Sequence, residues 1–432
     1  MKKFLSTMGV VALGATSLHA QYAPGLSAIE RTKPWSISAS LRGFYDDNVT
    51  TSPNSVARDS FGIEVSPSVS LNLALDQTFI GASYVYSMRY YEDSRFDTEH
   101  VHQFNAKLDH AFSERYKLEL NESFVIAQEP EVLDPTGVRT GAIRTEGDNI
   151  RNTASADFHA QLSPLLGTRL GYANNFYDYE QTGFNSRSAL LDRMEHLATV
   201  NLRWQALRQT IGVLGYNFEA VDYTSSDPVR YPGGIAEIFF GIPSAIAADS
   251  RNRYTHYFYV GADHNFNARL NASARVGGQY TEYYNMVGNQ NTIGPYADLN
   301  LTYTYMPGSF LQAGLRHSPN PTDLGAVSAT QFVLNQESTS VYASLTHRIT
   351  PRVTGNLLAQ YQHSTANAFD IFSGETENIG SDNFFIIGLN VSYRINPYWM
   401  AETGYNFDRL DSDFPNRSYT RNRVYVGLRA TY

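Results

Sequence analysis

The residues that could carry out hydrolysis lie in one short stretch. Ser155, Asp157 and His159 alternate along the chain, and a serine, an imidazole and a carboxylate can together activate a nucleophile. In an extended strand, however, residues two apart lie about 6.5–7 Å from each other. That separation is too long for hydrogen bonds, and the sequence has no Gly-rich phosphate loop or nucleotide motif. We therefore expect no enzyme and no catalytic residue.

A metal site would need several histidines close together, with carboxylates. The histidines on the apolar sides of alternating segments are instead scattered along the chain: His102, His110, His196, His256, His264, His317, His347 and His363. We therefore expect no metal site, and nothing in the sequence calls for a cofactor.

The charged residues show a clearer pattern, because nearly all that fall within alternating segments share one face. The predicted interior-lining residues are Arg42, Glu64, Arg89, Lys107, Lys117, Arg151, Asp157, Arg169, Arg203, Arg269, Arg275, Arg316, Arg348, Arg352, Arg394, Glu402 and Arg429. Basic residues predominate in this set although the formal net charge of the chain is −9. Rings of fixed charge select ions, so one hypothesis is an acidic mouth and a basic inner end that favours anions. The alternative is that arginines and carboxylates pair across strands and cancel.

Long strands must position these side chains. From Phe61 to Leu75, apolar and polar residues alternate for fifteen positions, far beyond the usual soluble strand of about five or six residues. A tilted membrane strand needs roughly nine to eleven residues. The sequence has no apolar run long enough for a membrane-spanning helix. A soluble β-sandwich would show the same alternation, so strand length and number must separate the two folds.

The same unit recurs from Trp35 onward, with two strands, a tight turn and then a longer polar loop. Short turns on one side and long loops on the other are typical of outer-membrane barrels. We predict an all-β transmembrane antiparallel up-and-down β-barrel of about 18 strands, with 16 as the alternative if Phe310–His317 is not a strand. Entry at Trp35 places the short turns in the periplasm and the long loops outside the cell. Aromatic residues near strand ends indicate two interfacial girdles, although strands favour aromatics in any case: Trp35, Tyr90, Phe112, Tyr116, Trp204, Phe266, Phe310 and Trp399.

The chain ends in an alternating strand whose pairing would close the barrel. Gly427, Ala430 and Tyr432 resemble the glycine, apolar residue and terminal aromatic that bacterial outer-membrane proteins present as an assembly signal, with Tyr in place of the usual Phe. The resemblance implies an encounter with the barrel-assembly machinery. Closure also removes the free strand edges that invite aggregation.

The remaining sequence features set the domain boundaries. Residues 1–20 have a basic head, a short apolar run and small residues before Ala20, which indicates a secretory signal peptide. We expect a periplasmic lead-in over residues 21–34 and a single barrel domain over residues 35–432. The chain has no cysteine, so no disulfide holds it together. Its acidic charge argues against nucleic-acid binding.

The stretch from Phe44 to Val49, Pro67 within a long strand, and residues 84–91 resemble the family named "putative beta-barrel porin" of bacterial outer membranes. Some members of that family accompany exopolysaccharide-production genes. The resemblance implies a bacterial outer-membrane location. It also suggests one alternative function, a conduit for exported polysaccharide.

The expected function is a porin-like channel for passive diffusion of small hydrophilic solutes. The alternatives are a polysaccharide conduit and a structural or adhesive barrel with a closed lumen. A sugar path would use inward aromatics, for which the candidates are Phe44, Tyr91, Tyr257, Tyr259, Tyr296, Tyr342 and Tyr425. The apolar loop 223–252 would fold inward as a constriction, pack over the rim or lie between subunits of a homo-oligomer. The other expected partner is outer-membrane lipid.

Overall fold

The computed structural model describes residues 33–128, 147–230, 245–286, 290–328, 330–370 and 373–432. The expected signal peptide and most of the lead-in lie outside these residues. So does the apolar part of the 223–252 loop. Among the described residues, no helix is long and apolar enough to cross a membrane.

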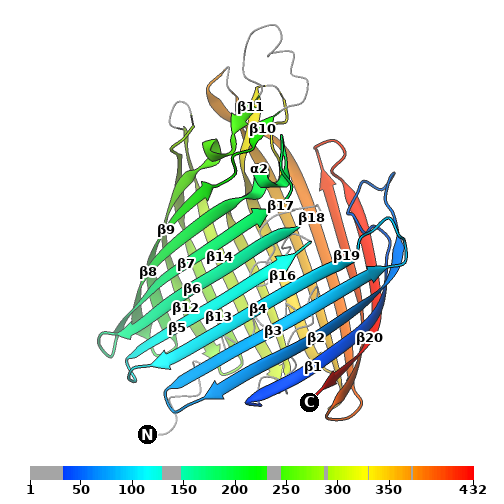
Figure 1. Ribbon diagram of the computed structural model, residues 1–432. Coiled ribbons are helices and arrows are strands. Elements are labelled where there is room, and N and C mark those ends of the chain that lie inside the picture. The colour runs from blue at the N-terminus through cyan, green and yellow to red at the C-terminus, as the bar shows by residue number, and fades with distance from the viewer. Residues whose placement is uncertain (1–32, 129–146, 231–244, 287–289, 329, 371–372) are drawn as a thin grey trace.

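The wall of the molecule is one closed antiparallel sheet of 18 strands, which confirms the predicted fold (Figure 1). Sequential strands pair with each other, and β1 also pairs with β20 to close the ring. The wall strands are β1 (Trp35–Asp46), β2 (Ser60–Ala74), β3 (Thr78–Tyr91), β4 (Glu99–Ala111), β5 (Tyr116–Ala127), β6 (Asn149–Gln161), β7 (Leu166–Tyr179), β8 (Arg193–Leu207), β9 (Thr210–Tyr223), β12 (Arg253–Asn267), β13 (Leu270–Tyr283), β14 (Gln290–Met306), β15 (Ser309–Asn320), β16 (Gln331–Arg348), β17 (Val353–Asp370), β18 (Glu375–Arg394), β19 (Trp399–Ser412) and β20 (Tyr419–Thr431).

Four small elements lie at the end of the barrel where the long loops gather, here called the mouth (Figure 1). They are α2 (Arg187–Leu191), the hairpin of β10 (Pro228–Arg230) and β11 (Ala245–Ala247), and the 3-10 turn η3 (Ala248–Arg251). The opposite end carries the tight turns and both ends of the described chain, and is here called the short-turn end. The weak segment Phe310–His317 forms most of β15, which settles the strand number at 18.

The last residue closes the ring as the terminal alternation predicts. Tyr432 and Ile37 exchange two backbone hydrogen bonds, of 2.8 and 3.2 Å. The Tyr432 ring lies 5.9 Å from the Trp35 ring, measured between centroids. Gly427 and Ala430 lie in β20, opposite Arg42 and Ala39 of β1. Their role as an assembly signal stays a prediction.

The apolar face of the wall points outward and has no protein cover. Leu71 is 41% exposed and Val426 is 66% exposed, whereas the alternating Ser66, Ser68 and Ser70 on the inner face are buried. In a soluble sandwich a second sheet would cover the apolar face. In a membrane barrel lipid covers it. The described wall therefore excludes the sandwich.

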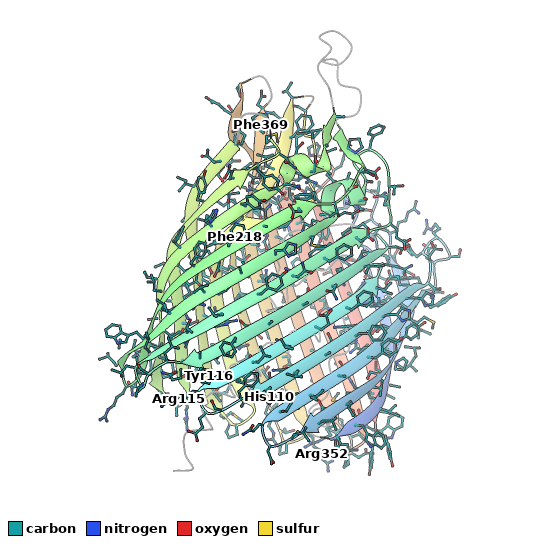
Figure 2. All side chains as sticks on the ribbon, turned by 60° about the vertical axis from the view of Figure 1, so that its left-hand side comes forward. His110, Arg115, Tyr116, Phe218, Arg352 and Phe369 are labelled. Atoms are coloured by element: carbon teal, nitrogen blue, oxygen red, sulfur yellow. The ribbon has the colours of Figure 1, made fainter. Side chains whose placement is uncertain are left out.

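Aromatic residues on the outer face gather near the short-turn end. Trp35, Phe112, Tyr116, Trp204 and Trp399 are all exposed there, and Figure 2 shows Tyr116 and His110 at that rim. Of the other predicted girdle residues, Phe266 joins this group, Phe310 lies beside it partly covered, and Tyr90 lies at the mouth end of β3. Amphipathic rings at this level suit a lipid–water interface.

Candidate functional site: the barrel lumen and its mouth

The inner wall near the mouth carries a linked set of ion pairs. Arg42 binds Glu64 at 3.1 Å and Glu402 at 2.5 Å, and Arg89 binds Glu64 at 2.8 Å and Glu99 at 3.2 Å. The register explains these contacts, because Arg42 lies opposite Glu64, and Glu64 lies opposite Arg89. All five side chains are buried. We call them the ion ladder.

A second set of pairs lies at the mouth end of β1 and β20. Asp46 accepts hydrogen bonds from Arg421 at 2.7 Å and from Arg423 at 2.8 Å. Sequence reasoning did not identify Arg421, Asp46 and Glu99 as lining residues, and it placed Asp46 and Glu99 in loops. The sequence did contain the necessary pattern. The alternation of β20 extends toward the N-terminus as far as Arg421, and the alternation of β4 begins at Glu99.

The remaining wall charges pair in the same way. Asp263 binds both Arg203, at 2.8 Å, and Arg275, at 2.5 Å, and Arg169 binds Asp157 at 2.7 Å. Lys107 pairs with Asp109, and Lys117 with Glu119, each within one strand. For these residues the structure shows the cancellation that the sequence left as one of two alternatives. Arg151, Arg316 and Arg429 also lie at inward positions of their strands.

Four of the predicted lining arginines lie at the short-turn rim. Arg348 and Arg394 are the last residues of β16 and β18, and Arg269 and Arg352 lie in turns. All four are exposed, and none forms an ion pair with another described residue. Figure 2 shows Arg352 and Arg115 at this rim. Unpaired positive charge is therefore concentrated at the short-turn end.

The hydrolase candidates do not form a catalytic group. The Asp157 carboxylate is bound by Arg169, and the Ser155 hydroxyl accepts a hydrogen bond from Asn121 at 3.4 Å. No hydrogen bond joins Ser155, Asp157 and His159 in this described part of the wall. Nor do the described residues contain a group of three or more His, Asp and Glu side chains that could hold a metal ion. Most outer-face histidines instead bond to neighbouring hydroxyls, as His196 does to Tyr172 at 2.8 Å.

Inward aromatic rings lie flat against glycines of the neighbouring strand. The Tyr425 ring covers Gly404, and the Tyr425 hydroxyl accepts a hydrogen bond from Asn390 at 2.5 Å. Phe44 over Gly62, Tyr259 over Gly215 and Tyr342 over Gly314 repeat this arrangement. Tyr91 and Phe44 also meet edge-on, with centroids 5.5 Å apart. These rings serve the packing of the wall, since glycine is the residue that lets a ring approach so closely.

Gly404→Ala should therefore destabilise the barrel. A β-carbon at position 404 would come within 2.4 Å of the Tyr425 ring, and overpacking of this kind costs about 1–3 kcal/mol. Urea unfolding in detergent micelles, followed by the shift of the folded band in gel electrophoresis, measures the loss. Gly43→Ala is the matched control, since a β-carbon there would meet nothing within 4 Å. Equal stability of the two variants would contradict the prediction.

A segment of the loop between β15 and β16 lies at the mouth and contacts several other loops there. We call residues 321–328 the bridge. A β-carbon on Gly325 would lie 3.0 Å from both Leu190 of α2 and Val229 of β10, so the bridge packs tightly against these elements. Leu324 of the bridge packs with Val333, Ala366 and Ala368. The bridge is thus held against the β7–β8 side of the mouth by apolar contacts.

An ion pair holds the other side of the bridge. Arg417, in the loop between β19 and β20, donates two hydrogen bonds to Asp323, of 2.9 and 2.5 Å, and one of 3.0 Å to Asp382 of β18. Burial alone would lower the pKa of Arg417, but the Asp323 and Asp382 carboxylates outweigh it and raise the pKa above its ordinary value. The β7–β8 and β19–β20 junctions lie on nearly opposite sides of the ring. Elements from nearly opposite sides of the ring therefore meet at Asp323 and Gly325 of the bridge, which are two residues apart.

The expected constriction loop, 223–252, is only partly described. Its arms lie at the mouth beside α2, where Val229 packs with Leu190 and Leu191. The Arg251 guanidinium donates to the carbonyls of Ala189 and Leu190 at 2.8 and 2.9 Å. The segment at which loops from both sides of the mouth meet in the described structure is the bridge, which sequence reasoning treated as an ordinary loop. No local pattern marks it, because its partners are distant in the chain.

A closed wall with an apolar outside, a polar inside and a terminal closing strand can now be compared with known proteins. Residues 336–432 match the family described as Putative beta-barrel porin 2. This is the family that the sequence resembles, and the matched segment runs from within β16 to the closing strand. The protein is a porin-like β-barrel of the bacterial outer membrane. No curated protein matches the chain.

Several solved outer-membrane proteins have a related backbone. The OccK2 (OpdF) structure of Pseudomonas aeruginosa in complex with glucuronate has 11% identity and a TM-score of 0.46, over 92% of this chain and 98% of that one. A BenF-like porin of Pseudomonas fluorescens has 10% identity and a TM-score of 0.45, over 93% and 99%. The FrpB iron transporter of Neisseria meningitidis, in its F5-1 variant, has 8% identity and a TM-score of 0.48, over 97% and 84%. Similarities this distant indicate no solute.

Proposed function

We propose that the protein is a passive diffusion channel for small hydrophilic solutes. The observation that carries this proposal is the inner wall, which is lined by polar side chains whose charges are largely paired with each other. A barrel of 18 strands is wide enough to hold water unless it is plugged. Charges that are already paired bind a passing solute weakly, which suits passage better than retention.

The bridge supports selection by size at the mouth. Loops from nearly opposite sides of the ring meet at it, so solutes would pass beside this junction. The same feature favours the closed-lumen alternative if the bridge and its neighbours fill the opening. The polysaccharide alternative has less support, because Tyr91, Tyr257, Tyr259 and Tyr425 are buried and do not offer open ring faces to a sugar.

Single-channel recording on the refolded full-length protein tests the proposal. We expect stable conductance steps in a planar bilayer, and swelling of protein-containing vesicles in small sugars that falls steeply with sugar size. Membranes treated with heat-denatured protein are the control. A folded protein without conductance would support the closed lumen. Passage of long oligosaccharides at the rate of monosaccharides would support the polysaccharide conduit.

The rim arginines should bias this channel toward anions. Arg269 and Arg352 are exposed at this rim and form no ion pair with another described residue. Exposed charges act over about 8–10 Å at moderate ionic strength. Replacing both with glutamine should move the reversal potential in a salt gradient toward cations, most strongly in dilute salt. Arg409→Gln, at an exposed pair with Asp411, should leave it unchanged. Cation preference in the unmodified protein would contradict the anion hypothesis.

A further inference from the structure

A carboxylate stands on the outer, lipid-facing side of the wall. On β5, Leu118, Leu120, Glu122 and Phe124 share one face, and Lys117 and Glu119 point the other way into the lumen. The Glu122 carboxylate accepts a hydrogen bond from the Asn152 amide of β6. On the next strands Asn174 bonds His196 at 3.3 Å, and Tyr172 bonds His196 at 2.8 Å. We call Glu122, Asn152, Asn174 and His196 the polar patch.

The strand register places Glu122 near the middle of the lipid band. Direct cross-strand partners form an oblique row, because barrel strands are tilted by about 35–45°. The row starts at Trp35 at the short-turn end and finishes at Tyr254 near the mouth, with Glu122 about halfway: Trp35, Leu71, Ala82, Ala106, Glu122, Ala154, Asn174, His196, Ala220 and Tyr254. At the corresponding level of the opposite wall, Ala343, Leu357 and Ala359 are apolar.

The outer wall is hollowed beside the patch. A groove of about 350 Å³ has a largely apolar lining that includes the outward side chains of Leu71, Ala82, Tyr84, Phe104, Ala106 and Glu122. Successive positions of the row are alanines, whose small side chains form the floor of the groove. The aromatic pair Tyr84 and Phe104, with ring centroids 4.5 Å apart, forms one side of it. Figure 2 shows this side of the barrel, with β4 to β7 toward the viewer. Small residues allow two membrane-embedded surfaces to approach closely.

Acyl chains cannot satisfy the polar patch, because they have no hydrogen-bond donors and headgroups do not reach the middle of the bilayer. The Asn152 amide meets one acceptor position of the Glu122 carboxylate, but an ionised carboxylate can accept several more hydrogen bonds, and leaving these unmade in hydrocarbon is costly. An occupant must therefore bring N–H or O–H donors to that depth. The patch itself has such donors in the amides of Asn152 and Asn174, together with the Glu122 acceptor. Donors and acceptors on one surface make it complementary to a copy of itself.

We propose that the β4–β8 wall is a dimer interface, with a second copy of this chain as its occupant. The side-chain tips of Glu122 and Asn152 touch, so they lie at one depth. Rotation about a two-fold axis parallel to the membrane normal keeps every group at its depth in the bilayer. If that axis passes between the two tips, the Glu122 carboxylate of each copy meets the Asn152 amide of the other. The result is a reciprocal network of four groups, flanked by two alanine-lined grooves.

Cysteine cross-linking tests the interface, because the chain has no cysteine of its own. Ala154→Cys lies beside the polar patch, and Ala359→Cys lies on the opposite wall as the matched control. Each variant is reconstituted at high dilution into phosphatidylcholine vesicles and treated with a short bis-thiol reagent. We expect a covalent dimer from Ala154→Cys and monomer from Ala359→Cys. Equal yields at the two positions, or no dimer from either, would overturn the proposal.

A second variant separates the polar network from general apolar contact. In the Ala154→Cys background, the double substitution Glu122→Leu and Asn152→Leu removes the reciprocal hydrogen bonds. Leucine is well tolerated on a lipid-facing surface, so the barrel should still fold and show its compact band in gel electrophoresis. Cross-linking should fall at least about fivefold, as expected for losing two or more hydrogen bonds between membrane proteins. Undiminished cross-linking would show that the polar patch does not hold the dimer and would overturn the inference.

Discussion

Arg417→Ala should open the mouth and produce the largest change in conductance of any single substitution in this protein. Arg417 is the residue that ties the bridge to the β18–β20 side, through Asp323 and Asp382. Removing one partner of a buried ion pair costs about 3–5 kcal/mol, because the remaining charges stay buried without compensation. Asp323 and Asp382 would both lose the Arg417 guanidinium, although Asp382 keeps a hydrogen bond from Gln336. We expect the bridge to leave the mouth and the single-channel conductance to rise severalfold.

The recording must separate bridge release from general damage to the barrel. Arg409→Ala is the matched control, because Arg409 also pairs with a carboxylate near the mouth, Asp411, but both side chains are about half exposed and such pairs contribute little. It should leave conductance unchanged. The distance between spin labels on the bridge and on β19 should lengthen in Arg417→Ala alone. Wild-type conductance in a folded Arg417→Ala protein would show that the bridge does not limit passage.

Glu64→Gln should destabilise the wall of the barrel. Glu64 lies between Arg42 and Arg89 and is the central member of the ion ladder. Glutamine keeps the shape of the side chain and removes its charge, leaving each arginine with one remaining carboxylate, Glu402 or Glu99. Because both arginines keep a partner, we expect a loss at the lower end of the range for buried pairs, about 3 kcal/mol. Urea unfolding in micelles measures this loss.

The same variant tests whether the ladder influences passing ions. It adds one net positive charge to the lumen, so the reversal potential in a salt gradient should move toward anions. Glu119→Gln is the control for stability, since its partner Lys117 is 45% exposed and pairs in water contribute little. If Glu64→Gln unfolds at the same urea concentration as Glu119→Gln, the ladder does not hold the wall together.

Much of the wall follows from local sequence. A side chain's face depends on the parity of its position along a strand, so the alternation from Phe61 to Leu75 predicts which residues meet lipid and which face the lumen. The same alternation at Arg423 to Tyr432 predicts the closing strand. Parity also carried a signal that sequence reasoning overlooked, because Glu122 shares its face with Leu120 and Phe124. The 18 strands and the inward placement of Arg42, Glu64 and Arg89 were predictable for this reason.

Contacts between distant parts of the chain were decided only by the tertiary structure. Which arginine meets which carboxylate depends on strand register, which places Arg42 between Glu64 of β2 and Glu402 of β19. The contact of the Tyr425 ring with Gly404 likewise depends on which residues the register of β19 and β20 places side by side. The bridge is the clearest case, because Asp323 and Arg417 are 94 residues apart and each lies in a loop without periodicity. Alternation is a property of neighbouring residues, whereas closure of the ring and the contacts between loops at its mouth depend on the whole chain.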